Sequence, residues 1–491
     1  MRRPRHYGND PGGTRLPIKL DAATNGEFAP IALARVHHRA NQLAFDSATR
    51  SATRLGLTRR AFLVSSCGAA ATLLAMNAAY AAQGRRGGYF DLPAEAALDG
   101  QLAAATLERH EFIFDVQGHF VNPTGAWTRA LPASARPLRF ATDRASCSSA
   151  SAPGLASLQC LGSEAFVKDV FLDSDTDLVV LSFVPSTRKG EPLTIEEAAA
   201  TAGIVERMEG THRMLLHGRV NPNQEGDLEA MDELAARYPI AAWKTYTQWG
   251  PDGRGFFLDD EPGLAMIEKA RKLGIRNVAV HKGLPFGPES YGHSTCVDVG
   301  RVAKRFPDVN FLIYHSGFVP GQPEGPYDPQ RSDGIDALIT SLHENNVRPG
   351  SNVYAELGST WRFLMRDPDS AAHALGKLLK HVGQDNVLWG TDSIWYGSPQ
   401  DQIQAFRTFQ ISAELVATHG YARITPALRA KVFGRNALRV YSISEDVLRK
   451  HLAGDRVSHD RLAYADQADP AFLTYGPKTR REFLNLKARG G

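Results

Sequence analysis

Residues 310–317 read Asn310-Phe311-Leu312-Ile313-Tyr314-His315-Ser316-Gly317. A short, continuous apolar run of this kind is typical of a strand that is buried on both faces of a parallel sheet. His315 directly follows the apolar residues. The sequence therefore predicts a buried strand with an imidazole at its carboxyl end.

Seven further runs share this character and alternate with segments of helical periodicity. The other predicted strands are Phe112–Val116, Leu178–Val184, Met214–Val220, Ile240–Thr245, Asn277–His281, Asn352–Glu356 and Val387–Thr391. Predicted helices between and after them include Glu261–Leu273, Cys296–Phe306, Asp333–Asn345, Ser370–Val382 and Gln400–Leu415. Eight such units predict an α/β fold, a closed (β/α)8 TIM-type barrel. An open, doubly wound sheet fits less well, because no GxGxxG or GxxxxGK[ST] turn occurs.

The spacing of these units gives the predicted domain boundaries. The barrel spans residues 112–442, with a helix over Ile424–Tyr441 packed on it. A long insertion, Val121–Gln159, follows the first strand and is rich in Pro, Ser, Ala and Arg, which predicts a lid or rim over the barrel mouth. Residues 443–491 are predicted to form a C-terminal helical extension.

A pattern typical of an export signal precedes the barrel. Arg59 and Arg60 are followed by an uncharged run to Ala82, with a small-x-small pattern at Ala79-Tyr80-Ala81. Residues 58–82 therefore resemble a twin-arginine signal peptide, which predicts export by the twin-arginine (Tat) machinery and a periplasmic location. An uncleaved membrane anchor fits less well, because the run is short and only weakly hydrophobic.

The rest of the N-terminal region shows no clear period. Residues 1–57 are predicted to be disordered, or to reflect a start codon placed too early, and residues 83–111 to be a linker or N-terminal segment of the barrel. Through Ala82 the chain carries 11 Lys and Arg against 4 Asp and Glu, and from Gln83 onward 45 against 49. The net charge of +3 thus comes from the leader. It gives no support for binding nucleic acid or an anionic membrane surface.

The cysteines indicate one candidate disulfide bond. Of four cysteines, Cys147 and Cys160 are candidates for a disulfide across a Ser/Ala-rich loop in an oxidising compartment, although sequence alone does not fix the pairing. No CxxC pair or Cys/His cluster with zinc-finger spacing occurs.

Polar side chains close several of the predicted strands. In a barrel of this type the carboxyl ends of the strands form one face, and the active site lies there. The polar residues at these ends are Gln117, His119, Lys244, His281, His315 and Asp392. A single buried histidine is more often structural, but imidazoles and a carboxylate that converge from separate strands can hold a divalent cation such as Zn²⁺. The set therefore predicts a metal site at the barrel mouth.

Five segments also resemble a known family. They are Phe114–His119, Val278–His281, Phe311–Gly317, Leu388–Asp392 and the final helix Arg429–Tyr441. Together they are similar to signature segments of the amidohydrolase-related (amidohydrolase 2) family, which includes hydrolases and non-oxidative decarboxylases. The resemblance covers about residues 112–442 in the expected order.

The resemblance implies a role for each matching residue. His119, His281 and Asp392 would bind one divalent ion, with Zn²⁺ expected and Mn²⁺ as the alternative. His315 would be the catalytic acid/base, and Asp392 would share the transfer of protons with it.

Gln117 departs from the family pattern, which has a histidine or a glutamate at this position. An amide oxygen is neutral and is a weaker ligand than a carboxylate or an imidazole. Three interpretations stay open: Gln117 is a weak fourth ligand, it hydrogen-bonds a bound water or the substrate, or the site has lost its metal.

Lys244 ends the fourth strand, where a lysine can be carboxylated and then bridge two metals in the wider amidohydrolase superfamily. Because a bridged pair usually needs two first-strand histidines, Gln117 favours a single metal. Lys244 is then interpreted as a charged group near the substrate or as a member of a buried ion pair.

Loops at the same face indicate the class of substrate. Aromatic residues beside an arginine, here Trp249, Arg362 and Trp395, suit a flat, acidic molecule.

The sequence thus predicts an exported metal-dependent hydrolase of a small organic acid, lactone, ester or amide, with cyclic and aromatic compounds included. The alternatives are a decarboxylase of an aromatic or unsaturated carboxylic acid, and a metal-free barrel that only binds. Its partners would be a small-molecule substrate and the export machinery, and a homo-oligomer stays open.

Overall fold

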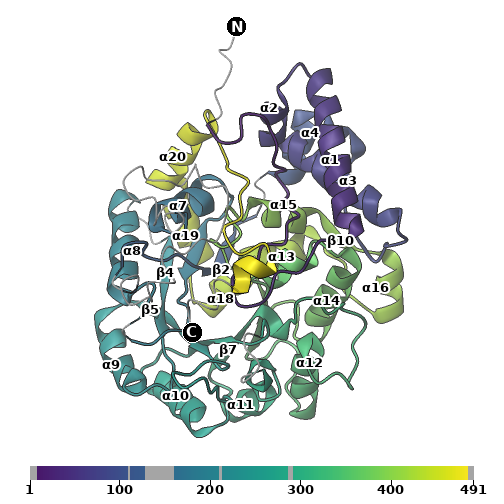
Figure 1. Cartoon of the computed structure of the whole chain (residues 1–491). Coiled ribbons are helices and arrows are strands. Elements are labelled where there is room, and N and C mark those ends of the chain that lie inside the picture. The colour runs from purple at the N-terminus through teal and green to yellow at the C-terminus, as the bar shows by residue number, and fades with distance from the viewer. Residues whose placement is uncertain are drawn as a thin grey trace.

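The computed structural model describes residues 8–108, 111–125, 127, 160–188, 190–209, 213–285 and 291–484. Eight parallel strands form one sheet in chain order, ringed by helices (Figure 1). The strands are β2 (Phe114–Gly118), β3 (Leu178–Leu181), β4 (Met214–Arg219), β5 (Ile240–Tyr246), β6 (Asn277–His281), β7 (Asn310–Tyr314), β8 (Val353–Glu356) and β9 (Val387–Leu388).

The last strand returns to the first and closes the barrel. The amide of Val116 donates to the Trp389 carbonyl at 3.0 Å, and Asp392 donates to the Gln117 carbonyl at 3.0 Å. Gly118 and Ser393 form a further parallel bridge. The predicted (β/α)8 barrel is therefore confirmed, with all eight predicted strands present and their ends shifted by a few residues.

Side chains along each strand point alternately into the barrel and toward the helices. Both sides are buried, which explains why the strands are continuous apolar runs in the sequence. Ala279 and Leu312 belong to the cluster inside the barrel, whereas Val278, Val280 and Phe311 belong to the layer between strands and helices. Because side chains alternate between the two faces of a strand, the interior set of β6 and β7 continues to His281 and Tyr314. The register pairs Tyr246 with His281 and His281 with Tyr314, so these side chains share one layer.

Helices cover the barrel and extend beyond it. Around the barrel lie α7 (Ser163–Val167), η4 (Lys168–Leu172), α8 (Ile195–Glu209), α9 (Asp227–Arg237), α10 (Glu261–Lys272), η5 (Gly292–Ser294), α11 (Val299–Arg305), η6 (His315–Gly317), α12 (Gly334–Glu344), α13 (Thr360–Leu364), α14 (Pro368–His381), α15 (Gln400–Thr408) and α16 (Ala413–His419). The closing helical segment consists of α17 (Pro426–Ala430), η7 (Lys431–Arg435) and α18 (Asn436–Val440), and the C-terminal extension contains α19 (Glu445–Ala453) and α20 (Arg456–Ala465).

The predicted helix Gln400–Leu415 is interrupted, and this prediction is wrong for residues 409–412, between α15 and α16. Residues Phe409–Ile411 form strand β10, which pairs antiparallel with β1 (Gly88–Phe90). The rings of Phe90 and Phe409 lie 6.0 Å apart. Tertiary pairing thus overrides the helical periodicity of the segment.

The expectation of disorder in residues 1–57 does not hold for residues 8–57. Helix α1 (Arg35–Arg54) packs against α3 (Ser66–Ala81), and it buries Ala40, Ala44 and Ala48. Alanines four residues apart lie on one face of a helix. This narrow stripe, set among charged residues, is the feature that makes the segment fold.

Residues 58–82 are packed into the fold as well. They form α2 (Arg59–Val64) and α3, and Arg60 is buried with its guanidinium 3.0 Å from the Asp469 carboxylate. The Asn77 side chain accepts from the Phe90 amide at 2.9 Å and donates to its carbonyl at 2.6 Å. No helix in the described ranges is long and apolar enough to cross a membrane. Export and cleavage after Ala81 stay predictions, and cleavage there would remove α1, α2 and α3.

The segments predicted as linker, insertion and extension differ in outcome. Residues 83–111 contain β1, η1 (Ala94–Ala97) and α4 (Gly100–Leu107). Most of the predicted lid, residues 126 and 128–159, lies outside the described residues, as does Cys147. Cys160 is disulfide-bonded, and Cys67 and Cys296 are free.

The C-terminal segment around residues 475–477 reaches the barrel mouth. The amides of Tyr475 and Gly476 donate to the Trp395 carbonyl at 2.8 and 2.9 Å, and the Thr24 amide donates to the Pro477 carbonyl at 3.0 Å. The N-terminal and C-terminal segments therefore pass beside each other over the barrel, as Figure 1 shows.

Candidate metal centre

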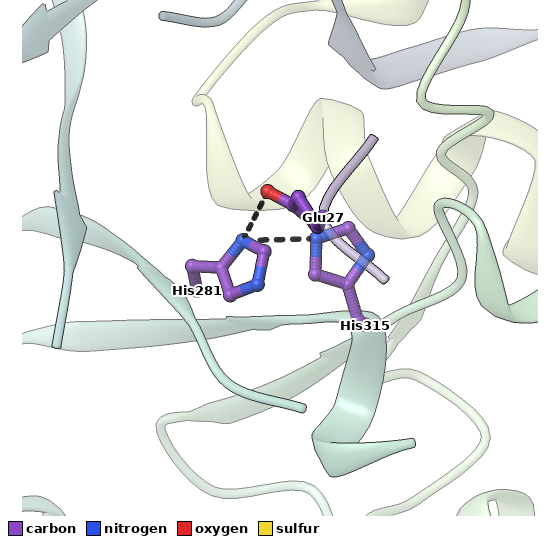
Figure 2. Close-up of side chains that lie close together, drawn as sticks. All are labelled: Glu27, His281 and His315. Atoms are coloured by element: carbon purple, nitrogen blue, oxygen red, sulfur yellow. Dashed lines mark hydrogen bonds and ion pairs between the residues drawn. The ribbon is translucent and has the colours of Figure 1, made fainter. Parts of the chain in front are cut away.

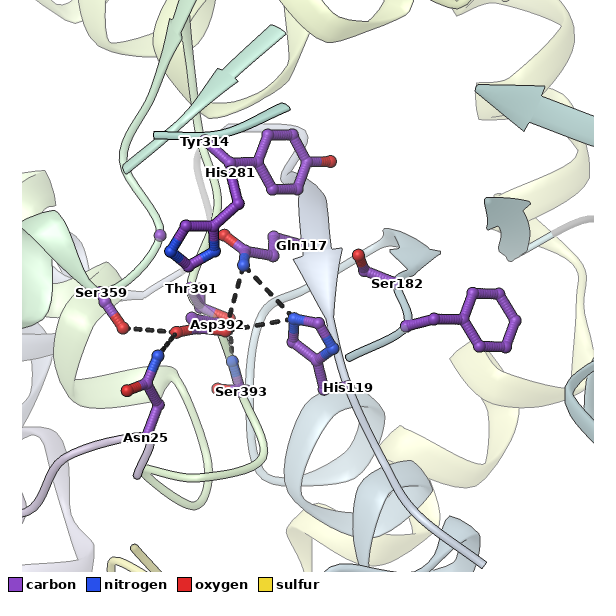
Figure 3. Close-up of polar contacts among 12 residues, drawn as sticks. Asn25, Gln117, His119, Ser182, His281, Tyr314, Ser359, Thr391, Asp392 and Ser393 are labelled. Atoms are coloured by element: carbon purple, nitrogen blue, oxygen red, sulfur yellow. Dashed lines mark hydrogen bonds and ion pairs between the residues drawn. The ribbon is translucent and has the colours of Figure 1, made fainter. Parts of the chain in front are cut away.

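The structure brings five of the predicted residues into one buried cluster at the carboxyl ends of the strands: Gln117, His119, His281 and Asp392 (Figure 3), together with His315 (Figure 2). His119 Nε2 lies 3.2 Å from Asp392 Oδ1. His315 Nε2 lies 3.2 Å from His281 Nδ1. Gln117 joins the two pairs, because its Nε2 is 3.1 Å from Asp392 Oδ1 and 3.5 Å from His315 Nε2.

His315 is held in a defined orientation. Its Nδ1 lies 2.6 Å from the Gly358 carbonyl, an acceptor only, so Nδ1 carries the proton and Nε2 offers its lone pair to the cluster. Burial lowers the pKa of His315 to about 4. Burial, followed by the neighbouring His315, also lowers the pKa of His281 well below its ordinary value. Both imidazoles are therefore neutral near pH 7 and can act as ligands or bases.

Asp392 stays ionised within the same cluster. Burial acts to raise the pKa of its carboxyl, but the contacts with His119, His315 and Ser359 together outweigh burial and hold that pKa below its usual range. Its second oxygen, Oδ2, accepts from Ser359 Oγ at 2.5 Å and from Asn25 Nδ2 at 2.9 Å. A negative charge is thus fixed in the same cluster as the neutral imidazoles of His281 and His315.

Two further buried acids hold the backbone of the site. Asp115 accepts hydrogen bonds from the amides of Gln117 and Thr391, both at 3.0 Å. Glu356 accepts from the amide of His315 at 3.0 Å. Burial raises the pKa of Asp115 to about 7 and that of Glu356 to about 8. Gly390 is required here, since a Cβ at that position would stand 1.6 Å from Glu356 Oε1.

Backbone strain is concentrated at the same strand ends. His315, Ser316, Ser359 and Asp392 have φ values of 67°, 54°, 53° and 57°. Residues other than glycine rarely adopt this left-handed region, and each instance costs about 1–3 kcal/mol. Such strain persists where the surrounding structure dictates it, which is typical of functional sites.

The donor set fits a divalent cation. Gln117 Nε2 lies among three atoms that can each offer a lone pair: Asp392 Oδ1, His315 Nε2 and, at 3.3 Å, His119 Nε2. Gln117 Oε1 is buried and has no hydrogen-bond partner among the described residues. Because the two ends of an amide have nearly the same shape, a half-turn of the group brings this oxygen to the centre. Imidazole nitrogens with carboxylate and amide oxygens suit Zn²⁺ or Mn²⁺.

Sequence reasoning missed Glu27 and Asn25. A ligand atom of Glu27 lies within 4.8 Å of ligand atoms of His281 and His315, and Figure 2 shows the three side chains together. Both missed residues belong to a segment for which the sequence predicts disorder. The only local signal is the turn-forming Asn25-Gly26 pair beside an acidic residue.

Lys244 lies against aromatic rings and not in an ion pair. It is fully buried, and its ammonium has no hydrogen-bond or ion-pair partner within the ranges the structure describes. The nitrogen lies 3.9 Å from the ring centre of Tyr314 and 4.5 Å from that of Tyr246. Burial lowers the pKa of Lys244 to about 7. The ion-pair interpretation is therefore wrong, and the charge of Lys244 is stabilised by aromatic faces.

The other predicted substrate-binding residues lie in different settings. Trp395 is near the cluster, with its ring centre 6.2 Å from that of His119. Arg362 is buried, and it donates to the Lys19 carbonyl and to Asp21 Oδ1, both at 2.6 Å. Trp249 is partly buried, and its carbonyl accepts from Asn223 at 2.9 Å. Arg362 is thus engaged by the N-terminal segment.

Comparison with known proteins gives one family and a group of solved structures. The family profile described as Amidohydrolase (Amidohydro_2) matches residues 114–443. No curated protein matches the chain.

Three solved structures have similar folds. A 2,6-dihydroxybenzoate decarboxylase from Rhizobium is 16% identical, with 68% of this chain and 99% of that chain covered and a TM-score of 0.40. A dihydroxybenzoic acid decarboxylase from Polaromonas with bound manganese is 14% identical, with 68% and 97% covered and a TM-score of 0.41. A putative 2-pyrone-4,6-dicarboxylic acid hydrolase from Pseudomonas putida is 13% identical, with 68% and 98% covered and a TM-score of 0.37.

Proposed function

This chain belongs to the amidohydrolase family, and from that premise we propose that it is a metal-dependent hydrolase of a small organic acid, lactone, ester or amide. Membership makes it an enzyme of the hydrolase or decarboxylase type. The observation that carries the finer proposal is the convergence of Asp392 with three imidazoles, those of His119, His281 and His315, in one buried cluster.

The metal would be held by residues from three strand ends. His119, His281 and Asp392 are the proposed ligands, and Gln117 is close enough to join them through its amide oxygen. A divalent ion there, for which we propose Zn²⁺ with Mn²⁺ as the alternative, supplies Lewis-acid polarisation of water and of a substrate carbonyl.

His315 and Asp392 are placed to move protons. His315 Nε2 is unprotonated, since Nδ1 donates to Gly358, so this nitrogen can accept a proton from water and return it to a leaving group. Asp392 is ionised, and it can take a proton while Ser359 and Asn25 hold its carboxylate in place. Lys244 and Trp395 supply a cation and an aromatic face, which suits a flat, acidic substrate.

Purified full-length chain tests this proposal with two measurements. Metal content is determined first, and we expect about one divalent ion per chain. The protein is then offered a panel of lactones, esters, amides and aromatic acids, with hydrolysis products and released CO2 measured separately. Hydrolysis without CO2 supports the proposal. Release of CO2 from an aromatic or unsaturated acid would replace hydrolase by decarboxylase, and absence of metal would favour a barrel that only binds.

We also propose export, on the twin-arginine pattern alone. Arg60 is buried against Asp469 in the folded chain, so recognition by the export machinery would require α2 to leave its place. Changing Arg59 and Arg60 together to lysine and locating the protein by fractionation tests this point. Retention in the cytoplasm supports export, and an unchanged distribution contradicts it.

Replacing Gln117 with glutamate is expected to tighten metal binding by about 10-fold or more. A carboxylate adds a negative charge where the amide offers only a dipole, and ligand charge is a main determinant of cation affinity. Competition with a chromogenic chelator measures the dissociation constant. An unchanged constant would show that this side chain does not face the ion, which favours the hydrogen-bonding interpretation of Gln117.

A further inference from the structure

We propose that Glu27, carried by the N-terminal segment, is a ligand of the metal and supplies the carboxylate that the first barrel strand lacks. This proposal rests on the metal-dependent function proposed above. Under this proposal the N-terminal segment contributes a metal ligand in addition to the ligands from the barrel motifs.

The distances fit a shared ion. Glu27 Oε1 lies 3.7 Å from His281 Nδ1, which lies 3.2 Å from His315 Nε2 (Figure 2). Bonds from Zn²⁺ to nitrogen and oxygen are about 2.0–2.2 Å, so two ligand atoms of one ion lie at most about 4.3 Å apart. Glu27 therefore reaches the ion that His281 would bind, from the side opposite the strands.

The charge balance of the site also favours Glu27 as a ligand of the metal. Asp392 is the only carboxylate among the residues expected to bind the metal from the barrel, since His119 and His281 offer imidazoles and Gln117 offers an amide. Glu27 adds a second negative charge, which balances a divalent cation more fully. Its side chain is only 17% exposed, so its charge acts in a poorly hydrated place where an isolated carboxylate is costly.

Asn25 links Glu27 to Asp392. Its Nδ2 donates to Glu27 Oε2 at 2.7 Å and to Asp392 Oδ2 at 2.9 Å, and its Oδ1 accepts from the Glu27 amide at 3.1 Å. One amide side chain thus sets the spacing between two carboxylates. Such a bridge is typical of the outer contacts that orient metal ligands.

The segment that carries Glu27 is anchored on both sides of it. The Lys19 ammonium is buried and lies 3.2 Å from Asp401, and Asp21 pairs with Arg362 at 2.6 Å. On the other side, Phe28 packs on Phe363 with ring centres 5.0 Å apart. A loop fixed in this way can hold a ligand without losing much entropy when the metal binds.

The test uses the full-length chain with Glu27→Gln, which keeps the size of the side chain and removes its charge. Asp46→Asn is the matched control, because Asp46 is exposed on α1 and its replacement removes the same charge. Dissociation constants for Zn²⁺ and Mn²⁺ are measured by chelator competition, and the visible spectrum of the Co²⁺ form reports the coordination. Thermal unfolding in excess chelator shows whether the apoprotein is intact.

We expect Glu27→Gln to weaken metal binding by at least about 100-fold and to alter the Co²⁺ spectrum, since loss of an outer contact alone costs about 10–100-fold. Asp46→Asn should leave both unchanged. If Glu27→Gln binds metal as tightly as the parent chain, the proposal is overturned while the metal-dependent function stands. The proposal is also overturned if the variant keeps its metal affinity and gains activity, because the segment would then only cover the site. If the parent chain binds no divalent metal, it is the proposed function that fails.

Discussion

Asp392→Asn is expected to lower kcat by about 10²–10⁴-fold, the range in which a positioned general acid or base contributes. The asparagine keeps the shape of the side chain and can still accept from Ser359 and Asn25, so the fold should survive. It cannot take up a proton, however, and it is a weaker ligand than a carboxylate. Steady-state kinetics on the substrate found in the panel, at saturating metal, measure the loss.

Asp446→Asn is a suitable control for this change, because Asp446 is exposed on α19. Metal content should be determined for both variants, since a loss of affinity and a loss of proton transfer lower activity for different reasons. Activity of Asp392→Asn within a few-fold of the parent chain would remove Asp392 from the proposed mechanism.

A chain that begins at Gln83 is expected to lose most of its stability and to aggregate. Removing residues 1–82 leaves Arg362 without Asp21 and Asp401 without Lys19, and breaking a buried ion pair costs about 3–5 kcal/mol. It also removes α3 from α4 and Phe28 from Phe363. Because the free energy of unfolding of a typical domain is only about 5–15 kcal/mol, these losses should exceed what the barrel can tolerate.

Soluble yield and thermal unfolding of the shortened and full-length chains, prepared side by side, measure this effect. Sequencing the amino terminus of the protein made in its natural host shows which form exists there. A shortened chain that is soluble, folded and active would contradict the expectation, and it would agree with the prediction that residues 58–82 are a signal peptide to be removed.

The barrel could be predicted because each strand is buried on both faces. Runs such as Phe311–Ile313 have no exposed position, and therefore no polar residue interrupts the pattern. The same topology predicts that His281 and His315 lie at one end of the barrel, because the carboxyl ends of its parallel strands share one face. For the barrel, the local sequence pattern and the arrangement of the strands in space lead to the same prediction.

The N-terminal part of the site could not be predicted, because it depends on contacts between distant segments. Asn25 and Asp392 are 367 residues apart, and neither carries a local sign of the other. The fold of α1 rests on alanines spaced four apart, a weak signal in a charged stretch. At Phe409–Ile411, pairing with β1 determined the structure although the local sequence favours a helix.

Because the segments around residues 24–28 and 475–477 meet over the barrel, the site forms in a fixed order during synthesis. The loop with Asn25 and Glu27 leaves the ribosome before any barrel strand, whereas its contacts at Arg362, Asp392 and Pro477 emerge only near the end of translation. Translation proceeds at about 5–20 residues per second. The loop with Asn25 and Glu27 therefore lacks these binding partners for many seconds after it is synthesised. The metal site is incomplete until the later segments have been made.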